Sequence, residues 1–435
     1  RAINLRSFPI NYTLFVTSCC KDTKKADANI SFSDFCSIFA AFYIYEKTMD
    51  FIDFTSYGYF WTIFCFVLFI IQLCYIFGVY ARVFRTAKRQ NAASDGECEL
   101  PPLSVIVVTK DSGNMLKEYL PKILEQDYPC FEVIVINDKS AGEDEDVLKL
   151  LAGKYNNLYH TFIPESARYV SRKKLGVAMG IRASKYDWVV MTEPYCYPST
   201  KNWLRSMACQ MKPDTDIVLG YCNYESGKGW FAKRITVSTL FRAMRYLGMA
   251  LAGHPYMGVG CNMAYRKKVY ESHKGFADHL QLQRGEDDLF VNAVAKAGNT
   301  RVAVSSDSIM RMPVPPFKRI WHEEKMNAMV TAKYYRGIAP YLNAIESWTC
   351  GLYHIFTIVA IAFCLIEQQW VLAGIAFALW LIRFVCAMAV YRLTSKAMQE
   401  NLCCVFPLFD LFRPLWSLTR RAQYLFRRKS DFMRR

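Results

Sequence analysis

The chain has 435 residues, enough for two modest domains or for one large domain accompanied by membrane segments. Hydrophobic residues make up 53%, aromatic residues 15%, and the formal net charge is +16, a balance that favours the second arrangement. This positive charge suits an anionic membrane face or an anionic small molecule. The sequence lacks zinc-finger spacing, RNP-like aromatic runs and long basic amphipathic helices of the nucleic-acid-binding type, so nucleic acid is not an expected partner.

Residues 1–48 form an extension of uncertain role. They show no signal-peptide pattern and no clear helical or strand period. Met49 stands just before the first long apolar segment. We therefore expect the working protein to begin near Met49.

The first apolar span covers residues 59–80 and contains no charged residue. It is long enough to cross a bilayer as a helix. Basic residues follow it at 82–89, whereas Asp50 and Asp53 precede it. The positive-inside rule then places the C-terminal side of this transmembrane helix in the cytoplasm.

The next part of the chain, residues 100–335, has the pattern of an α/β domain. Predicted strands at 103–109, 131–138, 159–163 and 187–192 alternate with predicted helices at 114–126, 143–152 and 171–185. Nearly continuous apolar strands that alternate with helices predict a mostly parallel sheet covered on both faces. Ligands of such sheets bind beyond the carboxyl ends of the strands. Asp138 and Glu193 both stand at such ends, so we expect them to share one crevice.

Two later apolar spans, residues 348–366 and 370–391, are separated only by the tripeptide EQQ. So short a link predicts a transmembrane hairpin over residues 348–391. Arg383 lies inside the second span, where a charge is costly unless it reaches the interface or faces a partner. The sequence alone assigns no partner to Arg383.

The end of the chain, residues 405–435, mixes Leu, Trp and Phe with many arginines. This mixture predicts a basic amphipathic tail that lies on an anionic leaflet. A disordered basic tail is the alternative.

The 16 cysteines are scattered along the chain. Cys19 and Cys20 are adjacent, as are Cys403 and Cys404, and several others lie in apolar runs. No C-x-x-C pair occurs, which argues against a structural zinc site. We expect reduced thiols that pack as small hydrophobic side chains.

Three segments of the α/β region resemble the family-2 glycosyltransferases of the GT-A fold, especially the membrane-attached bacterial ones. Residues 101–140 are similar to their nucleotide-binding opening, residues 171–198 to the segment that ends in their D-x-D loop, and residues 258–300 to their acceptor-side half. The resemblance implies a Rossmann-like, mostly parallel sheet. It also implies transfer of a sugar from a nucleotide-sugar donor, usually with inversion at the anomeric carbon.

The same resemblance implies roles for several acids. Asp138 corresponds to the aspartate that contacts the nucleotide base. A hydroxyl acceptor is a poor nucleophile near neutral pH, so a carboxylate must take its proton. In the motif "GEDDL" this general base is Asp287, and the flanking Glu286 and Asp288 hold it on the acceptor side. A solvated acidic helix start is the alternative interpretation of these acids.

The D-x-D loop departs from the family pattern. Its positions are filled by Glu193, Pro194 and Tyr195, so one carboxylate remains where the family usually holds Mg²⁺ or Mn²⁺ with two. With one carboxylate left, we expect Glu193 to bind a divalent metal, Mg²⁺ or Mn²⁺, only weakly. Lys173 and Arg266 are the cations that we expect to contact the donor instead.

The Q-x-x-R-W element departs as well. Residues 319–335 keep Trp321 and Lys325 on the expected acceptor side. The Q, R and W positions themselves are filled by Glu324, Asn327 and Ala328. Such a paired change is expected of a non-catalytic relative and equally of a change of donor.

We therefore expect a multi-pass protein of the bacterial inner membrane whose catalytic domain faces the cytoplasm. Its expected activity is transfer of a sugar to a lipid-linked or surface-glycan acceptor in cell-envelope polysaccharide biosynthesis. The main alternative is a catalytically inert homologue that binds a nucleotide sugar or scaffolds a partner enzyme. A processive polysaccharide synthase and an unrelated nucleotide-binding α/β protein are further alternatives.

Overall fold

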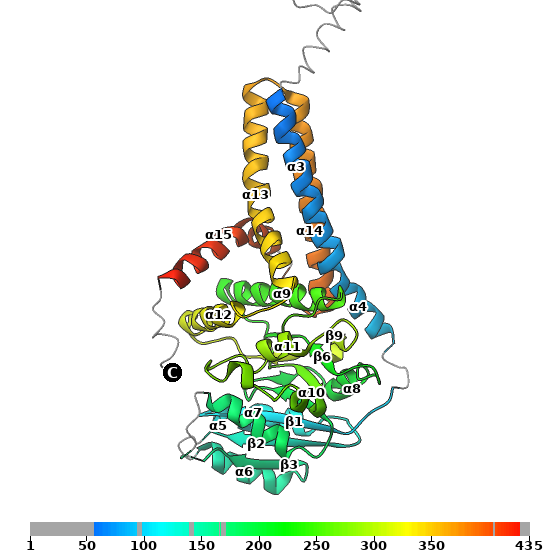
Figure 1. Cartoon of the computed structure of the whole chain (residues 1–435), viewed down its shortest axis with the longest axis vertical. Helices are drawn as coiled ribbons and strands as arrows, with labels where there is room; N and C mark the ends of the chain where they lie inside the picture. The colour runs from blue at the N-terminus through cyan, green and yellow to red at the C-terminus, as the bar shows by residue number, and fades with distance from the viewer. Residues whose placement is uncertain are drawn as a thin grey trace, which may run out of the picture.

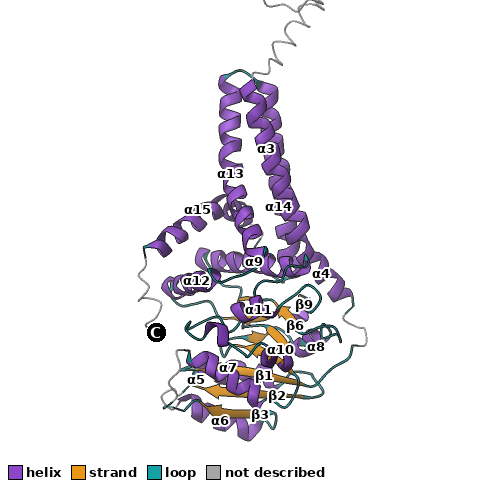
Figure 2. Cartoon of the chain, in the orientation of Figure 1, coloured by secondary structure: helices purple, strands orange, loops and turns teal. Residues whose placement is uncertain are grey.

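The computed structural model describes residues 56–93, 98–138, 143–164, 166, 171–402 and 405–426. Within these ranges an α/β domain carries a long bundle of helices on one side (Figure 1). All strands lie in the domain, and the bundle is helical throughout (Figure 2). The expectations for residues 1–48 and Met49, and for the arginines beyond residue 426, fall outside the described residues.

A seven-stranded sheet forms the centre of the domain, in the order β3-β2-β1-β4-β8-β6-β9. Its strands are β1 (Leu103–Thr109), β2 (Phe131–Asn137), β3 (Leu158–Phe162), β4 (Trp188–Thr192), β6 (Ile217–Gly220), β8 (Met263–Arg266) and β9 (Thr300–Ala303). Only β8 runs antiparallel to its neighbours in this sheet. The predicted strands are all present, and the mostly parallel sheet is confirmed. A smaller sheet contains β5 (Tyr197–Pro198), β10 (Met310–Met312) and β7 (Cys222–Tyr224).

Helices cover both faces of the large sheet. They are α5 (Gly113–Leu124), α6 (Glu143–Lys154), α7 (Arg172–Ala183), α8 (Trp203–Ala208), α9 (Trp230–Leu251), α10 (Lys267–Ser272), α11 (Asp288–Val294) and α12 (Lys318–Ala332). Successive residues of β1 alternate between the faces, because side chains alternate along a strand. Ile106 packs in the core with α7 and α9, and Val105 in the core with α5, α6 and α8.

Helix α7 lies close to the sheet. A Cβ atom on Gly180 would come within 2.6 Å of Ile106 Cγ2, and one on Gly176 within 2.8 Å of Val108 Cγ1. The absence of a side chain at these glycines lets the helix approach the strands. The first turn of α7 is thereby held at the carboxyl ends of β1, β2 and β4.

The bundle contains α3 (Ser56–Tyr75), α13 (Ala339–Ile366) and α14 (Trp370–Ala397), and α3 packs against both of the others. A π-helical turn, Ile76–Tyr80, joins α3 to α4 (Ala81–Ala92). Among the described residues, three helical segments are long and apolar enough to cross a membrane, as predicted: Phe60–Ala92, Ala339–Ile366 and Trp370–Ala397. Each of these helices is longer than the apolar run predicted from the sequence, because it continues into neighbouring polar residues.

Arg383 of α14 is buried and has the partner that the sequence did not reveal. Its guanidinium forms an ion pair with Asp410 and donates to Gln72 Oε1 at 3.0 Å. Asp410 lies on α15 (Phe406–Leu425), so the predicted C-terminal helix is present over that range. The helix supplies the counter-charge for Arg383 rather than only covering a surface.

A second buried acid joins the bundle to the domain. Glu346 of α13 forms ion pairs with Arg245 of α9 and with Arg413 of α15, the latter at 2.6 Å between Arg413 Nη2 and Glu346 Oε1. We call the following residues the junction cluster: Arg245, Glu346, Arg383, Asp410 and Arg413. These contacts fix α15, the bundle and α9 to one another.

One pair of cysteines corrects the expectation of reduced thiols. Cys98 and Cys209 form a disulfide with a Cα–Cα separation of 5.3 Å. The bond links the segment before β1 to the residue that follows α8. Sequence spacing gave no sign of this pair, because its members are 111 residues apart.

Candidate active site

The first turn of α7 is anchored to the segment that precedes the acidic motif. Ser171 caps the helix by accepting the N–H of Lys174 at 3.2 Å, and its hydroxyl donates to the carbonyl of Gln283 at 2.7 Å. The buried ammonium of Lys174 donates to the carbonyls of His279 and Leu282, at 2.5 and 2.8 Å. These bonds hold residues far apart in the sequence in one place.

Lys173 joins two of the predicted site acids. Its Nζ lies 2.5 Å from Glu193 Oε1 and 2.8 Å from Glu286 Oε1. Burial raises the pKa of Glu193 to about 7, although Lys173 opposes that rise. Burial acts against the ammonium of Lys173 too, but the surrounding carboxylates hold its pKa well above the ordinary value. The Lys173 side chain is therefore a fixed positive charge between two acids.

Asp287 lies beside Glu193, across Gly260. A Cβ on Gly260 would be 3.3 Å from Glu193 Oε1 and 3.4 Å from Asp287 Oδ2. The carboxylate of Asp287 accepts the N–H groups of Gly260 at 2.9 Å and Asp288 at 2.8 Å. Asp287 is only half-buried, whereas Glu286 and Asp288 are buried. Of the three acids in the motif, Asp287 is thus the one oriented firmly and still open to a ligand.

The flanking acids have different surroundings. Asp288 accepts hydrogen bonds from Thr331 at 2.5 Å and Tyr335 at 2.7 Å, and burial raises its pKa to about 6. Burial alone would raise the pKa of Glu286, but the ammonium of Lys173 lowers it. Glu286 Oε2 is buried with no hydrogen-bond partner among the described residues. Asp288 thus ties the motif to α12, and Glu286 ties it to α7.

Asp138 lies at the end of β2 and contacts the residue next to Lys173. Arg172 donates to Asp138 Oδ1, and the Lys110 ammonium lies 3.8 Å from Asp138 Oδ2. Two adjacent residues of α7 therefore contact acids from different segments. Arg172 contacts Asp138, and Lys173 contacts Glu193 and Glu286. We call Asp138, Glu193, Glu286 and Asp287 the carboxylate cluster. The structure brings these predicted residues together around the start of α7.

The loop after β4 does not fit a hard divalent cation well. Tyr195, at the position of the second acid, has its hydroxyl 4.0 Å from the sulfur of Cys261. The carboxylate of Glu193 is in contact with the Lys173 ammonium. Mg²⁺ and Mn²⁺ bind several oxygen ligands at once, and carboxylate oxygens are the strongest such ligands that side chains provide. In this chain the Lys173 ammonium contacts Glu193 at the place where family-2 glycosyltransferases usually hold such an ion.

Trp321 and Lys325, which were predicted for the acceptor side, both lie on α12. Trp321 is buried, and its ring is nearly perpendicular to that of Phe231, with 6.3 Å between the ring centres. The ammonium of Lys325 lies 5.7 Å from the centre of the Trp321 ring. Burial, followed by the charges of Arg242 and Arg420, holds the pKa of Lys325 well below its ordinary value.

Sequence reasoning missed the arginines that surround Lys325. We call the following residues the cationic cluster: Arg234, Arg242, Lys325 and Arg420. Burial lowers the pKa of Arg420 to about 10, with further repulsion from Arg245 and Arg234. Arg242 Nε is buried without a hydrogen-bond partner among the described residues. All four side chains are half-buried, and cations that repel one another are stabilised by an anion. No short motif could have revealed the group, because α9, α12 and α15 each contribute.

Arg266 is placed differently from the expectation. It pairs with Trp188 at the start of β4, and Glu193 follows the other end of that strand. Its guanidinium donates to Asp187 Oδ2 at 2.9 Å and to the carbonyl of Thr215 at 3.0 Å. The structure does not bring Arg266 to the carboxylate cluster, because β8 runs antiparallel to β4.

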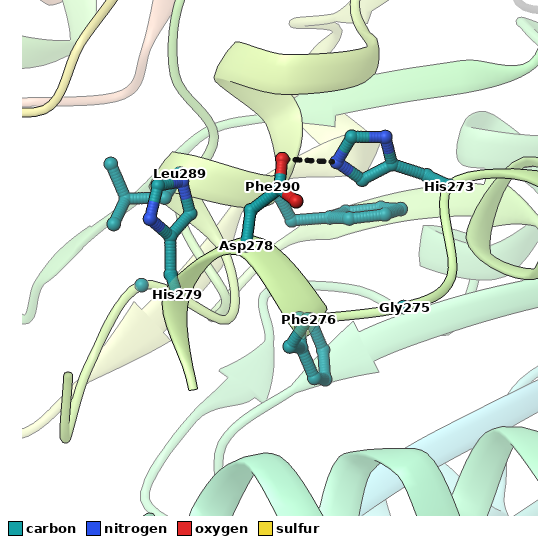
Figure 3. A pocket seen from close by; sticks show the side chains of 8 residues that line it. His273, Gly275, Phe276, Asp278, His279, Leu289 and Phe290 are labelled. Atoms are coloured by element: carbon teal, nitrogen blue, oxygen red, sulfur yellow. Dashed lines mark ion pairs between the residues drawn. The ribbon is translucent and has the colours of Figure 1, made fainter. Parts of the chain in front are cut away.

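A small hollow lies beside the acidic motif (Figure 3). It is lined by His273, Gly275, Phe276, Asp278, His279, Gly285, Leu289 and Phe290. The carboxylate of Asp278 faces the ring of His273, at 3.7 Å from Oδ2 to Nε2, and Phe290 lies beneath them. None of the site acids lines the hollow. It supports the start of α11 and is not the site itself.

The model of one protein family matches residues 66–422, and its description is glycosyl transferase family 21. The chain belongs to glycosyl transferase family 21. The resemblance to glycosyltransferases noted from the sequence is thereby confirmed, and the match extends over the bundle helices and α15 as well as the α/β domain.

One curated protein is similar to this family 21 member at low identity. The chain is 22% identical over 173 residues to the uncharacterized glycosyltransferase YibD of Escherichia coli K12. That alignment covers 38% of this chain and 49% of YibD, so the chain spans about half the length of the curated relative it matches.

Solved structures are similar at low identity. The mannosyltransferase PcManGT of Pyrobaculum calidifontis, in complex with GDP-Man and Mn²⁺, is 18% identical, with 77% of this chain and 98% of that chain covered and a TM-score of 0.46. Residues 1–349 of TarS from S. aureus, in complex with UDP-GlcNAc, are 15% identical, with coverages of 69% and 93% and a TM-score of 0.39.

Proposed function

We propose that this chain transfers a sugar from a nucleotide-sugar donor to a lipid-linked or surface-glycan acceptor, with inversion at the anomeric carbon. The observation that carries the proposal is the convergence of Asp138, Glu193 and Asp287 around the first turn of α7. These acids come from segments more than fifty residues apart in the sequence and meet at the carboxyl ends of parallel strands, which is where ligands of such sheets bind.

The general base of the proposed reaction is Asp287. It takes the proton of the acceptor hydroxyl while the acceptor oxygen forms a bond to the anomeric carbon. The bond from that carbon to the diphosphate breaks at the same time, and the nucleoside diphosphate leaves with the electron pair. Support comes from the partial exposure of Asp287 and from the two backbone N–H groups that orient its carboxylate. General-base catalysis of this kind contributes about 10²- to 10⁴-fold.

The charge of the leaving diphosphate is neutralised, in this proposal, by side chains. The cationic cluster has more positive charge than its surroundings balance, as the lowered pKa values of Lys325 and Arg420 indicate. Lys173 supplies a further positive charge next to Glu193. Fixed charges in a site shielded from water stabilise developing negative charge strongly. We therefore expect transfer to proceed without an added divalent cation.

We further propose that the chain is a multi-pass protein of the inner membrane and that the domain faces the cytoplasm. The helices that are long and apolar enough to span a membrane support this, as do the basic residues of α4. On α15, Leu411, Leu415 and Leu418 are exposed beside the basic residues. A helix of this kind binds an anionic leaflet, and anchoring raises the effective concentration of a lipid acceptor.

The proposal is tested with the full chain in lipid nanodiscs. Binding of a panel of sugar nucleotides is measured with and without EDTA, and transfer to extracted lipid acceptors is then measured with each donor that binds. Asp287→Asn is expected to keep donor binding and to lose transfer by about 10²- to 10⁴-fold. Asp214→Asn, which alters an exposed ion pair with Arg301, serves as the matched control. Wild-type turnover in Asp287→Asn would reject the assignment.

A second candidate function is supported by the position of Lys173. Its ammonium lies between Glu193 and Glu286, and Tyr195 replaces the second acid of the loop. An inert homologue that binds a nucleotide sugar would have the same features. Donor binding in the wild-type chain with neither transfer nor donor hydrolysis for any acceptor would favour this function over catalysis.

A further inference from the structure

Three cysteines from distant parts of the sequence meet beside the carboxylate cluster. Cys196 follows β4 in the loop that contains Glu193, Cys222 begins β7, and Cys261 precedes β8. Their Sγ atoms all lie within 4.8 Å of one another, and those of Cys196 and Cys222 are 4.0 Å apart. All three side chains are buried.

These separations match those of thiolates around one metal ion. Zinc–sulfur bonds of about 2.3 Å in a tetrahedral arrangement place two sulfur atoms about 3.8 Å apart. The sulfur atoms here need to move by no more than about an ångström to reach that spacing. We propose that Cys196, Cys222 and Cys261 form a binding site for a thiophilic cation, namely zinc.

The chemistry of the site separates it from the donor loop. Thiolates select soft or borderline cations such as Zn²⁺ and Cu⁺, whereas carboxylates and carbonyls suit Mg²⁺, Mn²⁺ and Ca²⁺. Zinc with three thiolates carries a net negative charge. Arg242 and Arg311 are near enough to favour the thiolate form of Cys222, although Arg311 also forms an ion pair with Glu400. The Tyr195 hydroxyl lies 4.0 Å from Cys261 Sγ. After a small movement of its side chain, this hydroxyl or a water molecule beside it fills the fourth coordination position of the zinc ion.

The site lies where three segments of the domain meet. Cys196 belongs to the loop after β4, Cys222 to the smaller sheet, and Cys261 to the segment whose Gly260 holds Asp287. A metal ion bound there would fix these segments relative to one another. Such binding adds to stability, because the unfolded chain has no preformed site. The inference does not depend on sugar transfer.

The test uses the full-length chain purified in detergent under reducing conditions. Metal content is measured by elemental analysis, and the chain freed of metal is titrated with Co²⁺ alone, with Zn²⁺ alone and with Cu⁺ alone. Cobalt reports thiolate ligands through a sulfur-to-metal charge-transfer band. The variants are Cys196→Ala, Cys222→Ala and Cys261→Ala. Cys364→Ala changes another buried cysteine, on α13, and is the matched control.

We expect the wild-type chain to bind one equivalent of Zn²⁺ or Co²⁺, with the charge-transfer band present and displaced by Zn²⁺. Each site variant loses the band, and both Cys364→Ala and Glu193→Gln keep it. Zinc binding is also expected to raise the thermal unfolding temperature of the wild-type chain and to protect the three thiols from alkylation.

A folded wild-type chain that binds no stoichiometric Zn²⁺ or Co²⁺ would overturn the proposal, and so would a band that persists in all three variants. Stoichiometric Cu⁺ with no Zn²⁺ would overturn the choice of zinc. Because the wild-type measurements decide these points, a variant that fails to fold leaves the test intact.

Discussion

The carboxylate cluster and the junction cluster both bury charged side chains, but their charges are balanced differently. In the junction cluster every acid contacts an arginine, and Arg383, Glu346, Asp410 and Arg413 are almost fully buried. In the carboxylate cluster Glu193 and Glu286 share the single ammonium of Lys173, and Asp287 is half-exposed. The first arrangement is closed and the second is open to a ligand.

The difference shows how buried charge can be assigned to stability or to function. A buried acid that is fully paired mainly fixes the relative position of the elements that carry it, although its net contribution to stability is small. A buried acid whose pKa stays raised despite a nearby cation is more typical of a functional site. Glu193, with a pKa of about 7, belongs to the second kind.

The largest effect is expected at the junction cluster. Arg383→Met leaves Asp410 buried without its main counter-charge, and breaking such a pair costs about 3–5 kcal/mol. The free energy of unfolding, measured in mixed detergent micelles, should fall by that amount. Replacing both residues, as Arg383→Met with Asp410→Leu, should restore most of the loss. Equal losses in the single and the double variant would show that the charge pair is not the cause.

The next effect concerns the pH dependence of the carboxylate cluster. The folded-state pKa of Glu193, about 7, lies above its ordinary value of 4.5. The folded chain therefore holds this proton more tightly than the unfolded chain does. The contribution of Glu193 to the free energy of unfolding is lost as the pH rises from about 4.5 to about 7, at about 1.4 kcal/mol per pH unit. Asp288, raised to about 6, acts in the same direction.

Glu193→Gln removes this titration. The unfolding free energy of the variant relative to wild type should rise by about 2–3 kcal/mol between about pH 4.5 and pH 7. Asp138→Asn, in the same cluster, is the comparison variant. A constant difference between Glu193→Gln and wild type across that range would contradict the raised pKa.

A smaller effect is expected at Lys173. Lys173→Met leaves Glu193 and Glu286 facing each other, but protonation of Glu193 limits the repulsion, so we expect a loss of about 1–2 kcal/mol in unfolding free energy near neutral pH. Lys173→Arg keeps the charge and should lose less. If both variants are as stable as wild type, the two contacts of Lys173 do not hold the cluster together.

The smallest effect is expected at Arg266, which lies outside both clusters. Its ion pair with Asp187 is partly exposed, and such pairs contribute about 1 kcal/mol or less. Arg266→Met should therefore change stability by no more than that and leave donor binding within about twofold, since about 0.4 kcal/mol corresponds to twofold. If calorimetry shows that Arg266→Met loses donor binding, Arg266 does belong to the donor site.

Much of the fold was predictable because its signals are local. The strand from Leu103 to Thr109 is a continuous apolar run, and Asp138 and Glu193 each follow such a run directly. Alternation with helices then implied parallel strands, and parallel strands bring these acids to one edge of the sheet. The position of Asp287 in the site rested on a motif match, which the arrangement around Gly260 supports.

Other parts of the site were not predictable, because their residues are close only in space. Arg242 and Arg420 lie on helices without any motif, and they meet Lys325 because α15 folds back onto the domain. The spacing argument against zinc considered only neighbouring cysteines, so it could not anticipate Cys196, Cys222 and Cys261 as one group.

The sequence by itself determined the order of strands and helices, the apolar length of the bundle helices and the acids at the strand ends. Each of these depends on hydrophobic periodicity or on residues next to one another in the chain. Tertiary structure alone decided which charges are paired, as in Arg383 with Asp410, and which remain open, as in Asp287. The physical reason is that burial and the distance between charges control their energies, and both depend on contacts across the whole fold.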